Sequence, residues 1–267
     1  MIVLRSTLFS LLFYSLNIIL SIAGIPVLFM SRRAAFGFIH FYVRSIYCLE
    51  KYVLGLDYEV RGREHLPASG PYIVAAKHQS PYETFKLHIL WPDPAVILKR
   101  ELIRIPLWGK YLSRSEPIAI DRSNARESLR ELVEGARSVR DHGRVLVIFP
   151  QGTRVNPWET TVEKPYRIGI GQMQEATFMR VIPMALNSGL FWPRKGWIRN
   201  PGKVVFEFLP PVPSDLSGRD MLRDLETRIE EATLALQEEA ERKYPWIKPS
   251  PTKSPLPEGE GIISETE

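Results

Sequence analysis

Cysteine is nearly missing from this chain of 267 residues, in which Cys48 is the only one. A single thiol cannot form an intramolecular disulfide, so a disulfide-stapled fold is excluded and a reducing compartment is indicated. Cys48 lies in an apolar stretch, where we expect a packed thiol rather than a nucleophile. At this length the chain can bury a core of its own, as one large domain or one domain with appendages.

Several motifs that define common enzyme classes are also missing. The sequence contains no G-x-x-x-x-G-K-[ST] phosphate loop, no G-x-S-x-G nucleophile elbow and no H-E-x-x-H zinc motif. Gly169-Ile-Gly171 lacks a third glycine and follows no good strand, which argues against a dinucleotide site. His78, Glu83 and His88 are spaced by five, and on a helix such side chains do not converge on one metal ion. We therefore expect neither a metal nor a bound cofactor.

Charge is absent from residues 6–30, whereas Arg5 and Arg32-Arg33 flank this segment. About 20 apolar residues suffice to cross a bilayer, but polar residues, glycine and proline interrupt the run, so a bent interfacial helix pair is an alternative to a span. A signal peptide fits less well, because the apolar region is long and the cleavage site poor. Residues 34–56 combine aromatic and apolar side chains with a few cations, as helices at a membrane surface do. We expect residues 1–56 to form a retained membrane anchor or interfacial helices.

The formal net charge is +5 although the end of the chain is acidic, so the body of the protein is more basic than the total suggests. A basic body suits nucleic acid, anionic lipid or phosphate-bearing substrates without choosing among them. Residues 246–267 are rich in Pro, Ser, Gly and Glu, and we expect a disordered tail there.

Strands and helices are expected to alternate between residues 57 and 245, which is the layout of an α/β domain. An apolar stripe predicts a helix over 123–142, with Ser123 as its N-cap and Gly143 at its end. A second amphipathic helix is predicted over 215–244. Short apolar runs predict strands at 58–60, 72–76, 95–98, 144–149, 180–186 and 203–209.

One junction between a strand and a helix is unusually polar. The strand over 72–76 leads to His78, and Ser80-Pro81 then has the sequence of a helix start, with Ser80 at the N-cap. His78 is thus placed beyond the carboxyl end of a strand, where α/β sheets bind ligands. Glu83 follows within reach of His78, but Ser80-x-x-Glu83 also has the spacing of a capping box. A catalytic pair and a plain helix cap are both open at this point.

Further polar clusters follow other predicted strands. Pro150-Gln-Gly-Thr-Arg154 joins a glycine turn to a hydroxyl and an arginine, which suits an anion. Asn187-Ser-Gly189 is another turn at a strand end, and Ile118-Ala-Ile-Asp121-Arg122 is an apolar run closed by an acid and a base. Taken singly, each is equally well explained as an ordinary turn or a surface salt bridge.

Taken in order along the chain, the clusters resemble the motifs of the glycerolipid acyltransferase family. The resemblance covers about residues 74–189 and includes four motifs, which is more specific than any one of them. Glu83 stands where the family usually has Asp, Gln151 where it has Glu, and Lys77 where it often has Asn. The motifs are His78-x4-Glu83, Lys99-x-Glu101-Leu102-x3-Pro106-x2-Gly109 followed by Ile120-Asp121-Arg122, Phe149-Pro-Gln-Gly-Thr-Arg154, and Val181-Ile-Pro183-Met-Ala-Leu-Asn187-Ser-Gly189.

The resemblance implies transfer of a fatty acyl group from acyl-CoA or acyl carrier protein to the sn-2 hydroxyl of 1-acyl-sn-glycerol 3-phosphate, giving phosphatidate. A thioester is already activated, so the reaction needs only a base for the hydroxyl and stabilisation of the oxyanion. His78 is expected to be the general base and Glu83 to orient it. Lys99, Arg122 and Arg154 are expected to bind the substrate phosphate. Gln151, Gly152 and Thr153 are expected to position the substrate or stabilise the transition state.

The implied fold is a mixed sheet flanked by helices, as in glycerol-3-phosphate acyltransferase, behind an N-terminal membrane-associated helical segment. The implied location is the inner membrane, with the catalytic domain on the cytoplasmic face, and the implied partners are a lysolipid, an acyl donor and membrane lipids rather than nucleic acid. Two alternatives stay open. One is the same chemistry on another lysolipid, such as a lyso-ornithine lipid, and the other is a non-catalytic lipid-binding protein of the membrane surface.

Overall fold

The protein is described by a computed structural model over residues 1–121 and 123–247. A sheet of seven strands has the order β1-β7-β6-β2-β5-β3-β4. Neighbouring strands are parallel except β6 and β7, so the sheet is mixed. The strands are β1 (Leu56–Arg61), β2 (Ile73–Ala76), β3 (Pro94–Lys99), β4 (Ile118–Ile120), β5 (Val145–Ile148), β6 (Val181–Leu186) and β7 (Gly202–Phe208).

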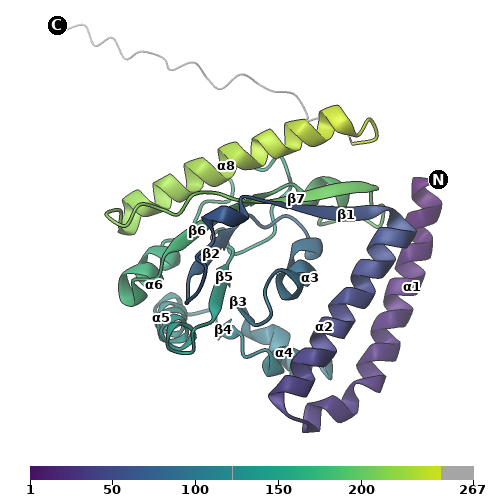
Figure 1. Cartoon of the computed structure of the whole chain (residues 1–267), viewed down its shortest axis with the longest axis horizontal. Coiled ribbons are helices and arrows are strands. Elements are labelled where there is room, and N and C mark those ends of the chain that lie inside the picture. Colours follow the sequence, from purple (N-terminus) through teal and green to yellow (C-terminus); the bar gives the residue numbers. More distant parts are fainter. Residues whose placement is uncertain (122, 248–267) are drawn as a thin grey trace, which may run out of the picture.

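Helices cover both faces of this sheet (Figure 1), which confirms the predicted mixed α/β fold. Besides two N-terminal helices, they are α3 (Pro81–Leu90), α4 (Trp108–Arg114), α5 (Ala125–Asp141), α6 (Gly169–Thr177), α7 (Ser188–Phe191) and α8 (Gly218–Lys243). The short 3-10 turns Arg63–His65 and Arg100–Arg104 complete the body.

Strand β2 lies inside the sheet, between β6 and β5, and is buried along its whole length. Successive side chains of a strand point to opposite faces. Val74 and Ala76 therefore pack in the apolar cluster that contains Tyr82 of α3, whereas Ile73 and Ala75 pack in the cluster that contains Ile229 of α8. The end of β2 thus presents alternate residues to two different layers of the molecule.

The six predicted strands are all present, with ends that differ by one or two residues. Strand β4 was not predicted as a strand, because three residues at the edge of the sheet are too few to show a period. The predicted N-cap at Ser123 is wrong: Asn124 accepts hydrogen bonds from the backbone N–H groups of Arg126 and Glu127, and the Ser123 hydroxyl donates instead to Asp121. Gly143 closes the helix with φ of +65°, as expected.

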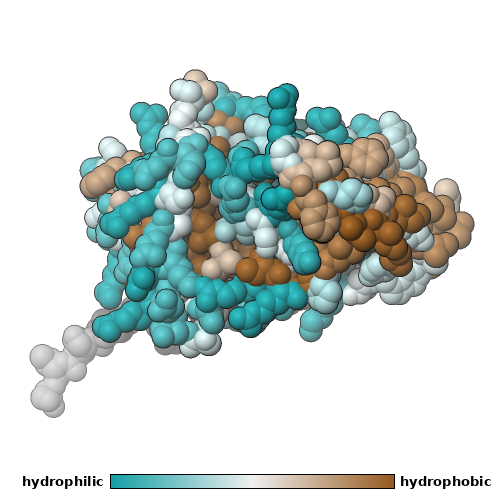
Figure 2. Space-filling view, turned by 90° about the horizontal axis from the view of Figure 1, so that it is seen from below, coloured by the Kyte–Doolittle hydropathy of each residue, from teal (hydrophilic) through white to brown (hydrophobic). Residues whose placement is uncertain are grey.

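The N-terminal segment is a helical hairpin that lies beside the body (Figure 1). Helix α1 (Ile2–Ala23) leads through a 3-10 turn (Ile25–Phe29) to α2 (Arg32–Leu49), which ends in a π-helical turn (Glu50–Leu54). By length and composition α1 is a candidate membrane span, and most of its apolar side chains are exposed. Figure 2 shows these apolar side chains gathered on the side of the molecule that α1 and α2 form.

Helix α1 nevertheless contacts the body near both of its ends. The Ser6 hydroxyl donates to the backbone oxygen of Arg199 and accepts from its N–H, while Tyr111 donates to the backbone oxygen of Ser21. Phe9, which lies between Ser6 and Ser21 along the helix, is fully buried. These contacts hold the helix along the body rather than away from it.

Helix α2 turns one side to the body, with Val43 and Ile46 buried there, and Glu50 follows on the same side at helical spacing. Cys48 lies off this side and is exposed, so the expectation of a packed thiol is wrong. At the other end of the chain Ile247 is buried, so the packed body extends past the predicted start of the tail, and the remainder of that segment lies outside the described residues.

Candidate active site

His78 and Glu83 form the hydrogen-bonded pair that their spacing suggested. His78 Nδ1 lies 2.8 Å from Glu83 Oε1, and Glu83 is completely buried. A carboxylate at Nδ1 places the ring proton on that nitrogen and leaves Nε2 as the basic one. No hydrogen bond to Nε2 occurs among the described residues, and His78 lines a large cavity. The imidazole is therefore arranged to accept a proton from a molecule in that cavity.

Glu83 also caps helix α3. Its Oε1 accepts hydrogen bonds from the backbone N–H groups of Gln79 and Ser80, at 2.6 and 2.7 Å, and the Ser80 hydroxyl accepts from the N–H of Tyr82. This is the predicted capping box, with Pro81 at the first helical position. The capping box is confirmed, and it does not exclude a role beside His78, because one carboxylate oxygen accepts hydrogen bonds at the helix start and lies within hydrogen-bond distance of the histidine at once.

The other oxygen of Glu83 is held from a distant part of the chain. Ser188 Oγ donates to Glu83 Oε2 at 2.7 Å, and the N–H of Gly189 donates to the Gln79 side chain at 3.0 Å. Both donors belong to the start of α7, which follows β6, and to the polar cluster Asn187-Ser-Gly189 that the sequence singled out without a role. Buried hydrogen bonds to both carboxylate oxygens fix the side chain, so the longer reach of glutamate does not loosen the pair with His78.

The turn after β5 forms the next wall of the site. Phe149 stacks on the His78 ring with centroids 3.9 Å apart, and the N–H of Val155 donates to the backbone oxygen of His78. Gly152 has φ of +67°, a left-handed conformation that other residues rarely adopt. A Cβ at position 152 would lie 3.1 Å from Nε of Arg167, so glycine also makes room for that side chain.

A cavity of about 830 Å³ extends from this turn into the protein. At the end near His78 it is lined by polar groups of the β5 turn and by Arg167. Beyond them the lining is mainly apolar and comes from α2, α3, β3, α4 and α5, with Phe38, Val96 and Leu129 among its residues. The volume is that of a small-molecule site. One polar end and a long apolar remainder suit an amphiphile.

The predicted phosphate-binding cations have different surroundings. Arg154 lines the cavity together with Gly152 and Thr153. Lys99 also lines it, but its ammonium pairs with Glu101 at 3.0 Å, so part of its charge is already balanced. Arg122 lies outside the described residues. The Gln151 side chain is turned elsewhere, since it is buried and donates to the backbone oxygen of Lys164.

Arg167 is a cavity-lining cation that the sequence interpretation missed. It is exposed, its N–H donates to the backbone oxygen of Pro150, and its side chain lies against Gly152. Within residues 1–121 and 123–247, neither Arg154 nor Arg167 forms an ion pair with a carboxylate. The loop that carries Arg167 has no helical or strand period, so only the basic residue itself marked it. The same ranges contain no cluster of His, Cys, Asp or Glu side chains able to hold a metal ion.

Comparison with known proteins agrees with this geometry. Residues 57–187 match the family model described as Acyltransferase. The chain is 35% identical to the 1-acyl-sn-glycerol-3-phosphate acyltransferase of Pseudomonas aeruginosa over 68% of its own length and 69% of that protein. The chain belongs to the glycerolipid acyltransferase family. It is 30% identical to the enzyme of that same name from Saccharomyces cerevisiae, over 70% of the chain and 61% of the yeast protein.

The fold is that of a solved member of this family as well. The crystal structure of the 1-acyl-sn-glycerophosphate (LPA) acyltransferase of Thermotoga maritima superposes with a TM-score of 0.70, covering 89% of this chain and 98% of that one. The two share 22% of their residues, so the likeness is one of fold. It extends beyond the family model, whose match ends at residue 187, and therefore includes elements on both sides of residues 57–187.

Proposed function

We propose that the protein transfers a fatty acyl group from a thioester to the sn-2 hydroxyl of 1-acyl-sn-glycerol 3-phosphate, giving phosphatidate. The observation that carries the proposal is the His78–Glu83 pair, which opens on a cavity that is polar at one end and apolar beyond it. The relatives named for this activity support the choice of acceptor. The family membership supports the type of reaction.

In the proposed reaction, His78 Nε2 takes the proton of the acceptor hydroxyl as its oxygen attacks the thioester carbonyl carbon. Glu83 holds the ring and stabilises the imidazolium that forms, so the substrate hydroxyl stands where the serine of a Ser-His-Asp triad would stand. The tetrahedral intermediate then collapses as the carbon–sulfur bond breaks. The proton passes from His78 to the departing thiolate, which leaves as a free thiol.

The anionic intermediate needs donors near its oxygen. We assign this role to the turn Pro150-Gln-Gly-Thr-Arg154, of which Gly152 and Thr153 line the cavity beside His78. Gln151 supports the turn from behind through its hydrogen bond to Lys164. The backbone hydrogen bond from Val155 to His78 ties this turn to the segment that carries the base.

The phosphate of the acceptor is assigned to the cations at the polar end of the cavity. Arg154 and Arg167 are the better placed, because both line it and guanidinium groups bind phosphate through paired hydrogen bonds. Lys99 adds positive charge at greater cost, since binding there competes with Glu101. The apolar remainder of the cavity suits a hydrocarbon chain, which gains about 0.8 kcal/mol for each buried methylene.

We place α1 and α2 at the surface of a membrane, with the exposed apolar side of α1 in the lipid. The supporting observation is that α1 contacts the body near both ends while its side chains such as Leu11, Ile18 and Ile22 are exposed. A lipid acceptor would then reach the cavity from the same membrane. The location at an inner membrane, with the catalytic domain facing the cytoplasm, is part of this proposal.

The test is a transfer assay with purified protein in mixed lipid and detergent micelles. Lysophosphatidate and acyl-CoA are expected to yield phosphatidate and free thiol in equal amounts, and acyl carrier protein thioester serves as the second donor. Competition with lysolipids that lack the phosphate monoester, including a lyso-ornithine lipid, tests the acceptor. If thioester is consumed only when such a lysolipid is present, that lysolipid and not lysophosphatidate is the acceptor. If the protein binds vesicles but consumes no thioester with any acceptor, the alternative of a non-catalytic lipid-binding protein is correct.

A further inference from the structure

Glu230 of α8 receives hydrogen bonds from two side chains that come from opposite halves of the matched family region. Lys77 Nζ donates to both of its carboxylate oxygens, at 2.6 and 2.7 Å, and the Tyr166 hydroxyl donates to Oε1 at 2.8 Å. The Lys77 side chain is only 1% exposed, and Tyr166 is buried as well. A single carboxylate therefore joins two segments that lie far apart in the sequence.

Each of these side chains directly precedes a residue of the site. Lys77 precedes His78, and Tyr166 precedes Arg167. The alternation along β2 continues here, because Lys77 extends to α8 on one face of the sheet while His78 contacts Glu83 of α3 on the other. Glu230 thus fixes, from behind the sheet, the two backbone segments that carry the histidine and the cavity-lining arginine.

The contact is costly to build, which argues that it is specific. Burial penalises the charged ammonium and lowers the pKa of Lys77, while the nearby Glu230 opposes this effect. A buried lysine that loses its partner is left as an uncompensated charge. The long, charged side chain of Lys77 gives this chain an ionic contact from the end of β2 to α8.

We propose that Glu230 is a positioning residue that sets the distance between His78 and Arg167. The inference rests on the proposed function, in which His78 takes the hydroxyl proton and Arg167 binds the phosphate of the same acceptor. The reaction requires both groups to engage one molecule in a single geometry, and a small displacement of either costs up to about a hundredfold in rate. Glu230 touches neither substrate nor cavity, so its effect passes through Lys77 and Tyr166.

The first experiment compares Glu230→Gln with Glu231→Gln in the full-length protein. Glu231 is an exposed neighbour on the same helix, so the same chemical change there provides a matched control. Glu230→Gln should lower kcat/KM for lysophosphatidate about tenfold to a hundredfold, and Glu231→Gln should leave it unchanged. Equal values for the two variants would overturn the proposal.

A second comparison separates positioning from a general structural role. Lys77→Met releases the histidine segment and should lower kcat with little change in KM. Tyr166→Phe removes only the hydroxyl that holds the arginine segment and should raise KM for the phosphate-bearing acceptor with little change in kcat. The same proportional loss in both variants, tracking the amount of folded protein, would mean that the network merely stabilises the fold and would overturn the proposal.

Hydrogen exchange provides a measurement that does not depend on the identity of the substrate. In Glu230→Gln, the backbone amides of residues 77–79, 164 and 166–168 should exchange faster than in Glu231→Gln, while those of β1 remain as they are. Faster exchange throughout the sheet, or none in either segment, would contradict the proposal. If the transfer assay shows that the proposed acceptor is wrong, this result still decides whether Glu230 holds the two segments together.

Discussion

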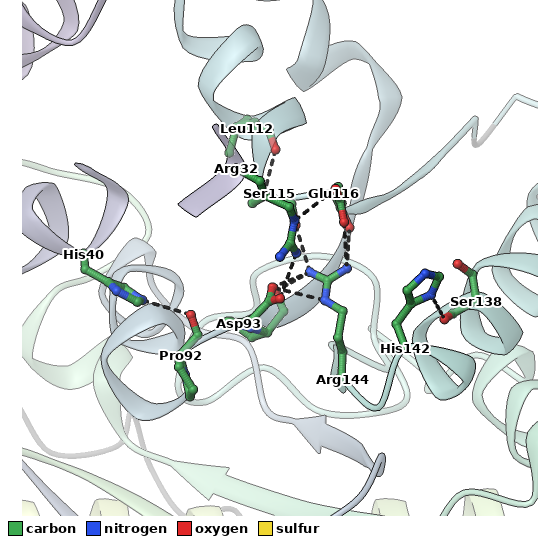
Figure 3. Close-up of polar contacts among 11 residues, drawn as sticks. Arg32, His40, Pro92, Asp93, Leu112, Ser115, Glu116, Ser138, His142 and Arg144 are labelled. Atoms are coloured by element: carbon green, nitrogen blue, oxygen red, sulfur yellow. Dashed lines mark hydrogen bonds and ion pairs between the residues drawn. The ribbon is translucent and has the colours of Figure 1, made fainter. Parts of the chain in front are cut away.

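The two ends of the parallel strands carry different kinds of polar cluster. Beyond the carboxyl ends of β2, β5 and β6 lie His78, the turn at residues 150–154, and Ser188. His78 and the turn line an open cavity, and Ser188 is buried behind them against Glu83. Before the amino ends of β3 and β5 lie Asp93 and Arg144, which form ion pairs with each other and with side chains of α2 and the turn after α4 (Figure 3).

The amino-end cluster satisfies itself. Arg144 donates to Asp93 and to the backbone oxygens of Ser115 and Glu116, while Arg32 pairs with both Asp93 and Glu116 (Figure 3). The two arginines and the two carboxylates of this cluster thus balance one another. At the carboxyl end, by contrast, His78 keeps one nitrogen without a partner in the described residues, and two arginines have no carboxylate. Mutual saturation thus indicates a structural cluster, and unused donors and acceptors beside a cavity indicate a site.

The strongest test of this distinction is His78→Ala. Removing the base should lower turnover by about a thousandfold, since general base catalysis contributes about 10²–10⁴-fold, and the free energy of unfolding should change little because His78 is at a cavity wall. Steady-state transfer and thermal unfolding measure the two effects. Turnover near that of the wild type would remove His78 from the mechanism.

The opposite result is expected from Arg144→Met at the amino end. The side chain is 11% exposed and its loss removes one of the two arginines that pair with Asp93, together with the hydrogen bonds to two backbone oxygens, so the free energy of unfolding should fall by about 3 kcal/mol. The kcat of the folded fraction should stay the same. Arg140→Met is the control, because Arg140 pairs with Asp141 on the exposed side of α5 and should contribute at most about 1 kcal/mol. If Arg144→Met lowered kcat without loss of stability, the cluster at the amino ends of the strands would not be a purely structural one.

A smaller effect is expected from Glu83→Gln, which sharpens the comparison within the site. Glutamine can still cap the helix start, as it does in other capping boxes, but it carries no charge to stabilise the imidazolium. We expect kcat to fall about tenfold to a hundredfold, with an unfolding free energy within about 1 kcal/mol of the wild type. Glu127→Gln, the equivalent change in the first turn of α5, should leave kcat unaffected. If Glu83→Gln lowered stability but left kcat unchanged, Glu83 would serve only as a helix cap.

The sequence was sufficient to predict the parts of the site that depend on local rules. The strand before His78, the N-cap at Ser80 and the spacing to Glu83 all follow from short-range patterns, and the structure contains each of them. Ser188 was found only as a polar turn, because its bond to Glu83 joins residues that are distant in sequence. Such a partner is set by the order of the strands, which puts β6 next to β2, and no periodicity encodes that order.

Arg167 and Glu230 were missed for the same physical reason. Arg167 lies in a loop without a repeating pattern, and its place beside the site depends on Gly152 leaving room for its side chain. Glu230 belongs to the polar side of an amphipathic helix, where a single carboxylate is ordinarily solvated. Its contact with Lys77 forms only when α8 covers the sheet. Long-range packing therefore adds to the site residues that motifs do not contain.

The smallest predicted effect concerns His88, which lies between the clusters at the amino and carboxyl ends of the strands. It lines the cavity from the last turn of α3, its Nδ1 is buried without a partner among the described residues, and burial lowers its pKa to about 4 from the usual 6.5. His40 and Arg144 also lower this pKa, and Asp93 raises it. The folded protein therefore keeps His88 neutral at a pH where the unfolded chain takes up a proton.

His88 thus contributes stability that is fully present above pH 6.5 and is lost as the pH falls toward 4. From pH 7 to pH 5 the free energy of unfolding should fall by about 1–2 kcal/mol from this residue, at about 1.4 kcal/mol for each unit of pKa difference. His88→Leu should remove that part of the slope, and the exposed His142→Asn should retain it. Unfolding curves in detergent at several pH values measure both. If the free energy of unfolding of His88→Leu depended on pH as it does in the wild type, the cavity would admit enough water for His88 to be protonated in the folded protein.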